Sequence, residues 1–130
     1  MNQHNTVTFR AAAATDLSAA ANLGFAVALD VDGRLVLAGV NGRDCIGILV
    51  ELPRAAGGPC GVATMGTVRA RAGGAIDEGD YVTSEAGGGL VIADEADDLL
   101  GKCVQRGAVA DGNMFDLLLS ISGGSTAPQP

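Results

Sequence analysis

Short apolar runs alternate with glycine-containing turns along most of this sequence. Pairs such as Asp32-Gly33, Asn41-Gly42 and Gly73-Gly74 supply the residues with positive φ that tight hairpins require. The runs between them are rich in Val, Leu and Ile and are shorter than typical helices. We therefore predict an all-β fold, a compact β-sandwich or barrel of the β-tulip type built from short hairpin-linked strands. The predicted strands are Thr6–Ala11, Phe25–Asp30, Arg34–Ala38, Cys45–Leu52, Cys60–Met65, Thr67–Arg71, Asp80–Ser84, Gly89–Ala93, Gly101–Gln105 and Met114–Ser122.

Two of these runs show how the strands should be buried. In Thr67–Arg71 charged and apolar side chains alternate, as in a strand with one face in the core. Leu117–Leu119 is apolar on both faces, which places the last strand in the centre of a sheet or at a subunit contact. The segment Asp16–Ala21 is the one place where a helical turn or two is predicted, capped by Thr15 or Asp16.

An internal repeat is the most informative feature of the sequence. When the chain is shifted by 55 residues, turn glycines fall on turn glycines and strand residues on strand residues. With one residue of slippage, Ile46-Gly47 also matches Leu100-Gly101. This predicts two similar β units, about residues 15–65 and 70–122, within one domain. The matched pairs include Gly24 with Gly79, Val27 with Val82, Gly33 with Gly88, Leu35 with Leu90, Val36 with Val91 and Ala38 with Ala93.

Composition and charge narrow the function classes. The net charge of −7 disfavours direct binding to nucleic acid or to anionic lipid. Aromatic residues make up only 3% of the chain, so stacking platforms for bases or sugars are scarce. Residues 1–5 and 123–130 lack periodicity, and we expect an N-terminal arm (1–14) and a flexible C-terminal tail (123–130). We expect neither a secretory signal nor a membrane span.

No group of residues has the spacing of a known catalytic or metal site. The three cysteines form no C-x-x-C pair, and His4 is the single histidine, so we predict no disulfide framework, no metal site and no cofactor. Phosphate-binding loops and nucleophile elbows are absent. We therefore predict that the protein is not an enzyme. One cluster keeps two interpretations, a solvated loop or a weak cation site: Asp94, Glu95, Asp97 and Asp98.

Five segments, in this order, resemble the head decoration (capsid cement) proteins of tailed bacteriophages. They are Phe25–Ala38, Cys45–Leu49, Ala72–Ser84, Gly88–Ala93 and Asp116–Leu119. The resemblance implies a structural protein that binds the outer surface of the head and stabilises it by bridging subunits of the major capsid protein. It also implies a homotrimer at three-fold and quasi-three-fold positions. The protein would then be made in the host bacterial cytoplasm and reside on the virion.

The resemblance further implies that the N-terminal arm orders on the shell. The residues predicted to add a strand to a capsid edge are Thr6, Val7, Thr8, Phe9 and Arg10. Two alternatives remain open at this point. One is a non-catalytic β-barrel binding module of a cellular assembly, and the other is a small hydrolase that uses the acidic loops. A biotinyl or lipoyl carrier would need a lysine at a hairpin tip, whereas Lys102 lies inside a predicted strand.

Overall fold

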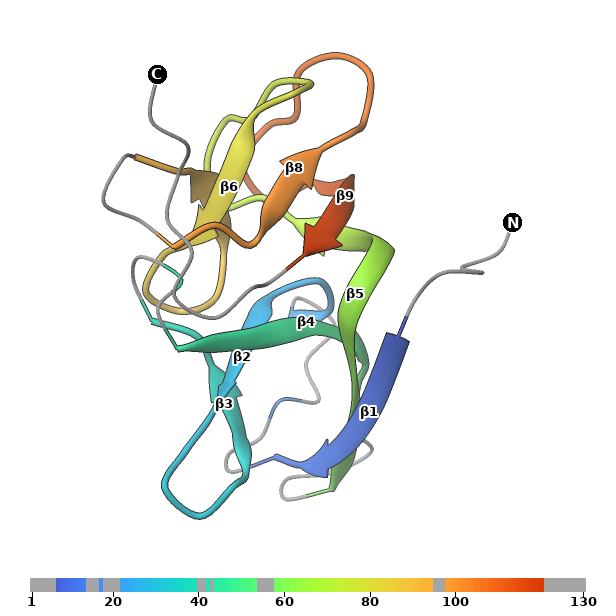
Figure 1. Ribbon diagram of the computed structural model, residues 1–130, viewed down its shortest axis with the longest axis vertical. Helices are drawn as coiled ribbons and strands as arrows, with labels where there is room; N and C mark the ends of the chain where they lie inside the picture. Colours follow the sequence, from blue (N-terminus) through green and yellow to red (C-terminus); the bar gives the residue numbers. More distant parts are fainter. Residues whose placement is uncertain are drawn as a thin grey trace.

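A computed structural model describes residues 7–13, 17, 22–39, 42, 44–53, 58–94 and 98–120, with the side chains of 7–11 excepted. The regular elements in these ranges are nine β-strands, which confirms the predicted all-β fold (Figure 1). The strands are β1 (Val7–Ala12), β2 (Ala26–Leu29), β3 (Leu35–Leu37), β4 (Cys45–Glu51), β5 (Pro59–Arg71), β6 (Tyr81–Ser84), β7 (Leu90–Ile92), β8 (Gly101–Cys103) and β9 (Met114–Ser120).

All nine strands belong to one curled antiparallel sheet. Its order is β3-β2-β4-β5-β9-β8-β6-β7, and β1 pairs with β5 outside this path. Val62 and Ala63 of β5 each pair with a residue of β1 and a residue of β4, so β5 lies between these two strands. Figure 1 shows β5 as the long strand that runs from the part of the molecule holding β1 to the part holding β9.

The prediction of two separate strands at Cys60–Met65 and Thr67–Arg71 is wrong, because β5 runs through Gly66 without a break. Gly66 has a φ of 106°, a positive value of the kind that glycines adopt in tight turns. Its ladder to β9 nevertheless continues from Met65–Ser120 through Gly66–Leu119 to Thr67–Leu118. The hydrogen bonds of the partner strand hold this residue in the sheet, and no hairpin forms.

The two outer hairpins have the same register. In β2–β3 the pairs are Val27–Leu37 and Leu29–Leu35, and the pairs in β6–β7 lie 55 residues later. The next strand also matches, because Val27 pairs with Gly47 and Val82 with Gly101. A Cβ on either glycine would collide with a backbone carbonyl oxygen of the following strand, that of Ala63 or of Leu118. The same close approach therefore requires glycine in both places.

The matching registers extend beyond the ranges 15–65 and 70–122. The ladder between β1 and the first part of β5 corresponds to the ladder between the second part of β5 and β9. The pair Phe9–Val62 in the first ladder matches the pair Val68–Leu117 in the second. Both first strands also end in a parallel bridge to the third strand, Ala13 to Leu35 and Ala72 to Leu90. We call residues 7–65 the first unit and residues 66–120 the second unit.

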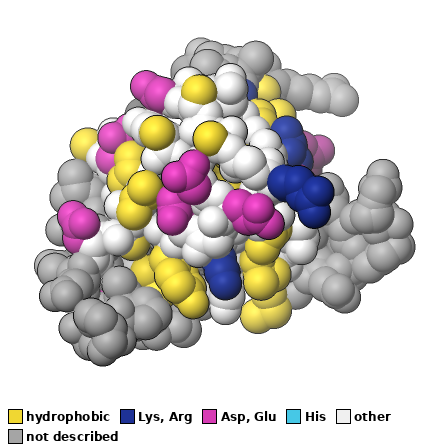
Figure 2. All heavy atoms as spheres, turned by 90° about the horizontal axis from the view of Figure 1, so that it is seen from above, with side chains coloured by type: hydrophobic (Ala, Val, Ile, Leu, Met, Phe, Trp, Pro, Cys, Tyr) yellow, Lys and Arg dark blue, Asp and Glu magenta, His cyan; other side chains and the backbone are white. Residues whose placement is uncertain are grey.

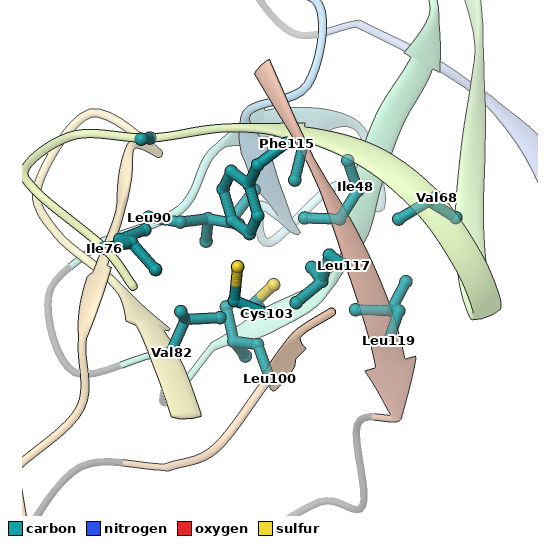
Figure 3. Close-up of a cluster of buried hydrophobic side chains, with 14 of the residues drawn as sticks. Ile48, Val68, Ile76, Val82, Leu90, Leu100, Cys103, Phe115, Leu117 and Leu119 are labelled. Atoms are coloured by element: carbon teal, nitrogen blue, oxygen red, sulfur yellow. The ribbon is translucent and has the colours of Figure 1, made fainter. Parts of the chain in front are cut away.

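The core consists of two clusters with corresponding members. The smaller cluster fills the first unit and contains Ala13, Leu17, Val27, Leu35, Leu49, Cys60 and Val62. The larger cluster contains the corresponding residues of the second unit: Ala72, Ile76, Val82, Leu90, Cys103, Phe115 and Leu117. It also takes in Ala26, Ile48 and Ala63 from the first unit, and Ile48 lies beside Phe115 in Figure 3. One face of the first unit is thus buried against the second.

Several predictions fall outside the described residues: most of the helical turn expected at Asp16–Ala21, most of the N-terminal arm before Val7, and the tail 123–130. The last strand is described to Ser120. It lies in the centre of the sheet order, which is one of the two positions predicted from the apolar run Leu117–Leu119. Among the described residues, no helix is long and apolar enough to cross a membrane.

Two adjacent leucines of β9 provide a test of this packing. Leu117 is fully buried, whereas Leu118 points outward and is 46% exposed. We expect Leu117→Ala to lower the free energy of unfolding by about 2–5 kcal/mol, because it leaves a cavity in the core. Leu118→Ala is the matched control and should change it by less than about 1 kcal/mol. Urea denaturation measures both, and equal losses would contradict the assigned faces of β9.

Candidate functional site

The predicted arm lies partly within β1. Thr6 is outside the described residues, and the backbone of Val7, Thr8, Phe9 and Arg10 is paired with β5 of the same chain. These residues therefore form the first strand of the first unit as well as the predicted contact segment. The sequence indicated an extended strand here but not its partner.

β1 also has a second edge. In the part of the chain that the structure describes, β5 is the one strand paired with β1, and the Ala13–Leu35 bridge follows just past its end. A strand with a free edge presents N–H and C=O groups to which another chain can add a strand. None of the described strands pairs with the outward edge of Val7–Arg10, while the inward edge is paired with β5.

A row of exposed side chains crosses four strands of the second unit. Thr67 pairs with Leu118, Leu118 with Lys102, and Lys102 with Tyr81. Directly opposite residues share one face of a sheet, so these four side chains point the same way. The Lys102 ammonium lies 5.6 Å from the centre of the Tyr81 ring, a cation–π contact.

Further exposed side chains widen this row. Met65 and Val104 are exposed. Met65 lies two residues before Thr67 on β5 and Val104 two residues after Lys102, just past the end of β8, so both continue the same face. Arg69 and Asp116 form an ion pair of 2.9 Å beside Val104, whose N–H donates to the Asp116 carbonyl. We define the outer face by its five exposed large side chains: Met65, Tyr81, Lys102, Val104 and Leu118. Figure 2 shows apolar side chains lying between acidic and basic ones at the end of the molecule that carries β6 and β8.

The turn between β2 and β3 is a second exposed feature. The Asp30 carboxylate accepts the backbone N–H groups of Asp32 and Arg34, both at 2.9 Å. These hydrogen bonds, that from Arg34 first, lower the pKa of Asp30 below its usual value, so the carboxylate is ionised near neutral pH. Val31, the second residue of the turn, is 101% exposed, and Leu29 is also exposed. We call residues 29–34 the hairpin tip.

The described acidic and sulfur-containing side chains were candidates for a metal site. No group of three His, Cys, Asp or Glu side chains in the described ranges lies close enough to hold a metal ion. Of the acidic loop, Asp94 and Asp98 are described, while Glu95 and Asp97 are not. The cation interpretation of this cluster stays a prediction.

The three cysteines are buried and form no disulfide bond with one another. Burial raises the pKa of the Cys45 thiol to about 12, and the thiol donates a hydrogen bond to the Gly47 carbonyl. Desolvation also raises the pKa of Cys103. Such thiols are poor nucleophiles, because the reactive species is the thiolate.

The outer face was not predicted from the sequence, although part of its signal was present. Leu118 stood out as the middle residue of an apolar triplet, and Lys102 as a lysine inside a strand. The alignment of the two with Tyr81 depends on the order β9-β8-β6, which local sequence patterns do not determine.

Buried thiols lead to a simple prediction. At about pH 8 we expect the folded protein to react with a maleimide at least about 100-fold more slowly than the protein in urea, because labelling requires opening of the core. Mass spectrometry of the labelled protein counts the modified cysteines, and the urea sample is the control. Rapid labelling of Cys45 or Cys103 without denaturant would contradict their burial.

Comparison with known proteins finds a similarity among solved structures. No family model matches the sequence, and no curated protein matches it significantly. Among solved structures, the head fiber gp8.5 N base of bacteriophage phi29 superposes with a TM-score of 0.64 and 20% sequence identity. The match covers 95% of this chain and 99% of that one. The chain therefore shares, over nearly its whole length, the fold of a phage head fiber base.

Proposed function

We propose that this chain is a structural protein of a tailed-phage head, a decoration protein that binds the outer capsid surface. It stabilises the head by bridging subunits of the major capsid protein. The observation that carries the proposal is the shared fold with the phi29 head fiber base, which extends over 95% of the chain. The five segments that resemble head decoration proteins, in the same order along the chain, also support it.

The surface chemistry supports a binding role. The exposed features of the described residues are a strand edge that no described strand pairs with, an apolar outer face and a hairpin tip. A protein that acts by contact needs such surfaces and no reactive group. The net charge of −7 suits attachment to the outside of a head better than contact with the packaged nucleic acid.

The attachment segment in this proposal is Thr6–Arg10. Val7–Arg10 is fixed to β5 on one edge, so its other edge is held ready to pair with a strand of a capsid subunit. Main-chain pairing of this kind gives affinity with little dependence on side chains. Three such edges in a homotrimer at a three-fold or quasi-three-fold position would bind together, and avidity would exceed the affinity of one strand.

The alternative is a non-catalytic β-barrel module of a cellular assembly. The same exposed surfaces would serve it, but the fold comparison favours the phage head. A carrier version of this alternative has little support, because Lys102 lies in β8 with its ammonium over Tyr81 and not at a hairpin tip.

Binding to heads is the direct test. We expect the purified protein to co-sediment with undecorated heads of the phage that encodes it, to saturate at a fixed number of copies per head, and to raise the temperature at which heads disrupt. Serum albumin, another acidic protein, serves as the control for non-specific adsorption. Failure to bind undecorated heads at micromolar concentrations would contradict the proposal.

The role of β1 is tested in the same assay with two neighbouring variants, Phe9→Pro and Arg10→Pro. Successive N–H groups of a strand point to opposite edges, so one variant removes an N–H directed at β5 and the other removes one directed outward. We expect the variant that loses the N–H directed at β5 to lose stability. The variant that loses the outward N–H should fold like the wild type. It should bind heads at least about tenfold more weakly, since one pairing hydrogen bond is blocked. Wild-type binding by the folded variant would contradict the arm proposal.

A further inference from the structure

A turn of the first unit binds the end of a strand of the second. The N–H of Arg71, the last residue of β5, donates to the Gly24 carbonyl at 2.9 Å, and the Arg71 Nε donates to the Leu23 carbonyl at 3.0 Å. A Cβ added at Gly24 would lie 2.9 Å from the Arg71 nitrogen and 2.9 Å from the Met114 side chain. Residues 22–24, which we call the β2 turn, are therefore packed closely against the end of β5.

The second unit contains the same turn in front of β6, at residues 77–79, which we call the β6 turn. Gly79 has a φ of 89°, against 92° for Gly24. The N–H of each glycine donates to a carbonyl of the neighbouring strand, that of Leu49 in β4 or that of Cys103 in β8. The two turns thus have matching backbone conformation and matching hydrogen bonds inside their own units.

The β6 turn lacks the outside contact that the β2 turn makes. A Cβ added at Gly79 would have no atom within 4 Å, and no described residue donates a hydrogen bond to the Gly79 carbonyl. Asp77 and Glu78 of this turn are exposed. The β6 turn therefore presents to the outside an acceptor that its counterpart uses.

The strand end that corresponds to Arg71 is also found in the first unit, at the end of β1. The residue just past each strand, Ala13 or Ala72, donates its N–H at 2.9 Å to the residue in front of the partner strand, Gly58 or Asn113. The last residue of each strand therefore occupies the corresponding position: Ala12 in β1 and Arg71 in β5.

The Ala12 N–H points to the outward edge of β1. Successive N–H groups of a strand point to opposite edges, and the N–H of Ala13 points toward Gly58. None of the described strands pairs with the outward edge at Ala12, and Ala12 is exposed. Its N–H is the donor that corresponds to the Arg71 N–H.

The molecule thus carries both halves of a hydrogen bond that it already makes once between its units. Figure 1 shows β1 in the lower part of the molecule and β6 in the upper part, so the two halves lie in different places. A second copy of the chain supplies the missing half to each. It presents a turn whose backbone already fits such a strand end, because the β2 turn and Arg71 make this contact internally.

We propose that the β6 turn of one copy binds the end of β1 in a second copy, with the Ala12 N–H donating to the Gly79 carbonyl. The contact joins two different surfaces, so it is head-to-tail and closes into a ring when the rotation between copies permits. A ring of three would account for the trimer proposed above, and only this number rests on the proposed function. Ala12 lies just past Val7–Arg10, so the contact leaves that segment to the capsid.

The association between copies is weaker than the contact within one copy. Ala12 has no guanidinium group, whereas Arg71 uses its own to bind the Leu23 carbonyl as well. The two units inside a chain are also held together by the continuous strand β5. The experiments therefore extend to high protein concentration.

Cross-linking between copies tests the assigned surfaces. Two single variants, Glu78→Cys and Ala12→Cys, are mixed and treated with a short bismaleimide. We expect at least about tenfold more cross-linked dimer than in a mixture of Val31→Cys and Ala12→Cys, the matched control with a fully exposed cysteine on the hairpin tip. The native cysteines are buried, so the introduced ones react first. Cross-linking at the level of the control overturns the proposal.

Sedimentation velocity of the full chain over about 1 μM to 1 mM measures the association itself. We expect the wild type to self-associate and Ala12→Pro, which removes the donor, to raise the dissociation constant about tenfold. Ala12→Ser keeps the N–H and should associate like the wild type. A thermal melt checks that each variant folds, and if Ala12→Pro does not, the cross-linking decides.

Two results of the sedimentation experiment would overturn the proposal. One is a wild type that stays monomeric up to about 1 mM, and the other is undiminished association of a folded Ala12→Pro variant. Heads are absent from both experiments, so either result leaves attachment to the capsid to be judged by the head-binding assay. Conversely, a chain that associates as expected but does not bind heads would retain this contact and lose the proposed function.

Discussion

The continuity of β5 through Gly66 is the constraint on which the rest of the structure depends. One strand supplies the last position of the first unit and the first position of the second, so the ladders to β1, β4 and β9 all share its backbone. Gly66 makes this possible because a positive φ of 106° is accessible to glycine without strain. The two units are therefore parts of one sheet, and burial of Ile48 against Phe115 follows from their fixed orientation.

Much of the fold could be predicted from local patterns. Hairpin turns such as Asp32-Gly33 carry their own signal, because few residues other than glycine adopt the required φ, and the strands on either side of them were located to within one or two residues. The same reasoning failed at Gly66, where a turn signal was overridden by pairing with β9. Long-range pairing decides between a turn and a kinked strand, and a sequence window contains no information about it.

For the candidate binding surfaces, too, local features could be predicted from the sequence and long-range pairing could not. An extended segment at Val7–Arg10 was visible in the sequence, but its pairing with β5 depends on residues about 50 positions away. The outer face went unrecognised because its members are isolated residues of unremarkable type, Leu118, Lys102 and Tyr81, that the sheet order brings into one row. A motif on one loop can be recognised from its sequence. A surface formed by several strands can be recognised only when the order of those strands in the sheet is known.

The register of β5 also has a topological consequence. Met65 pairs with Val7 on one side and with Ser120 on the other, so the first and last described strand residues flank a single position. Two strand spacings separate them, roughly 10 Å. A peptide or protein fused before Val7 and another fused after Ser120 would leave from neighbouring points, and a short linker between those points would allow circular permutation. Display of cargo at either end would thus use the same place on the molecule.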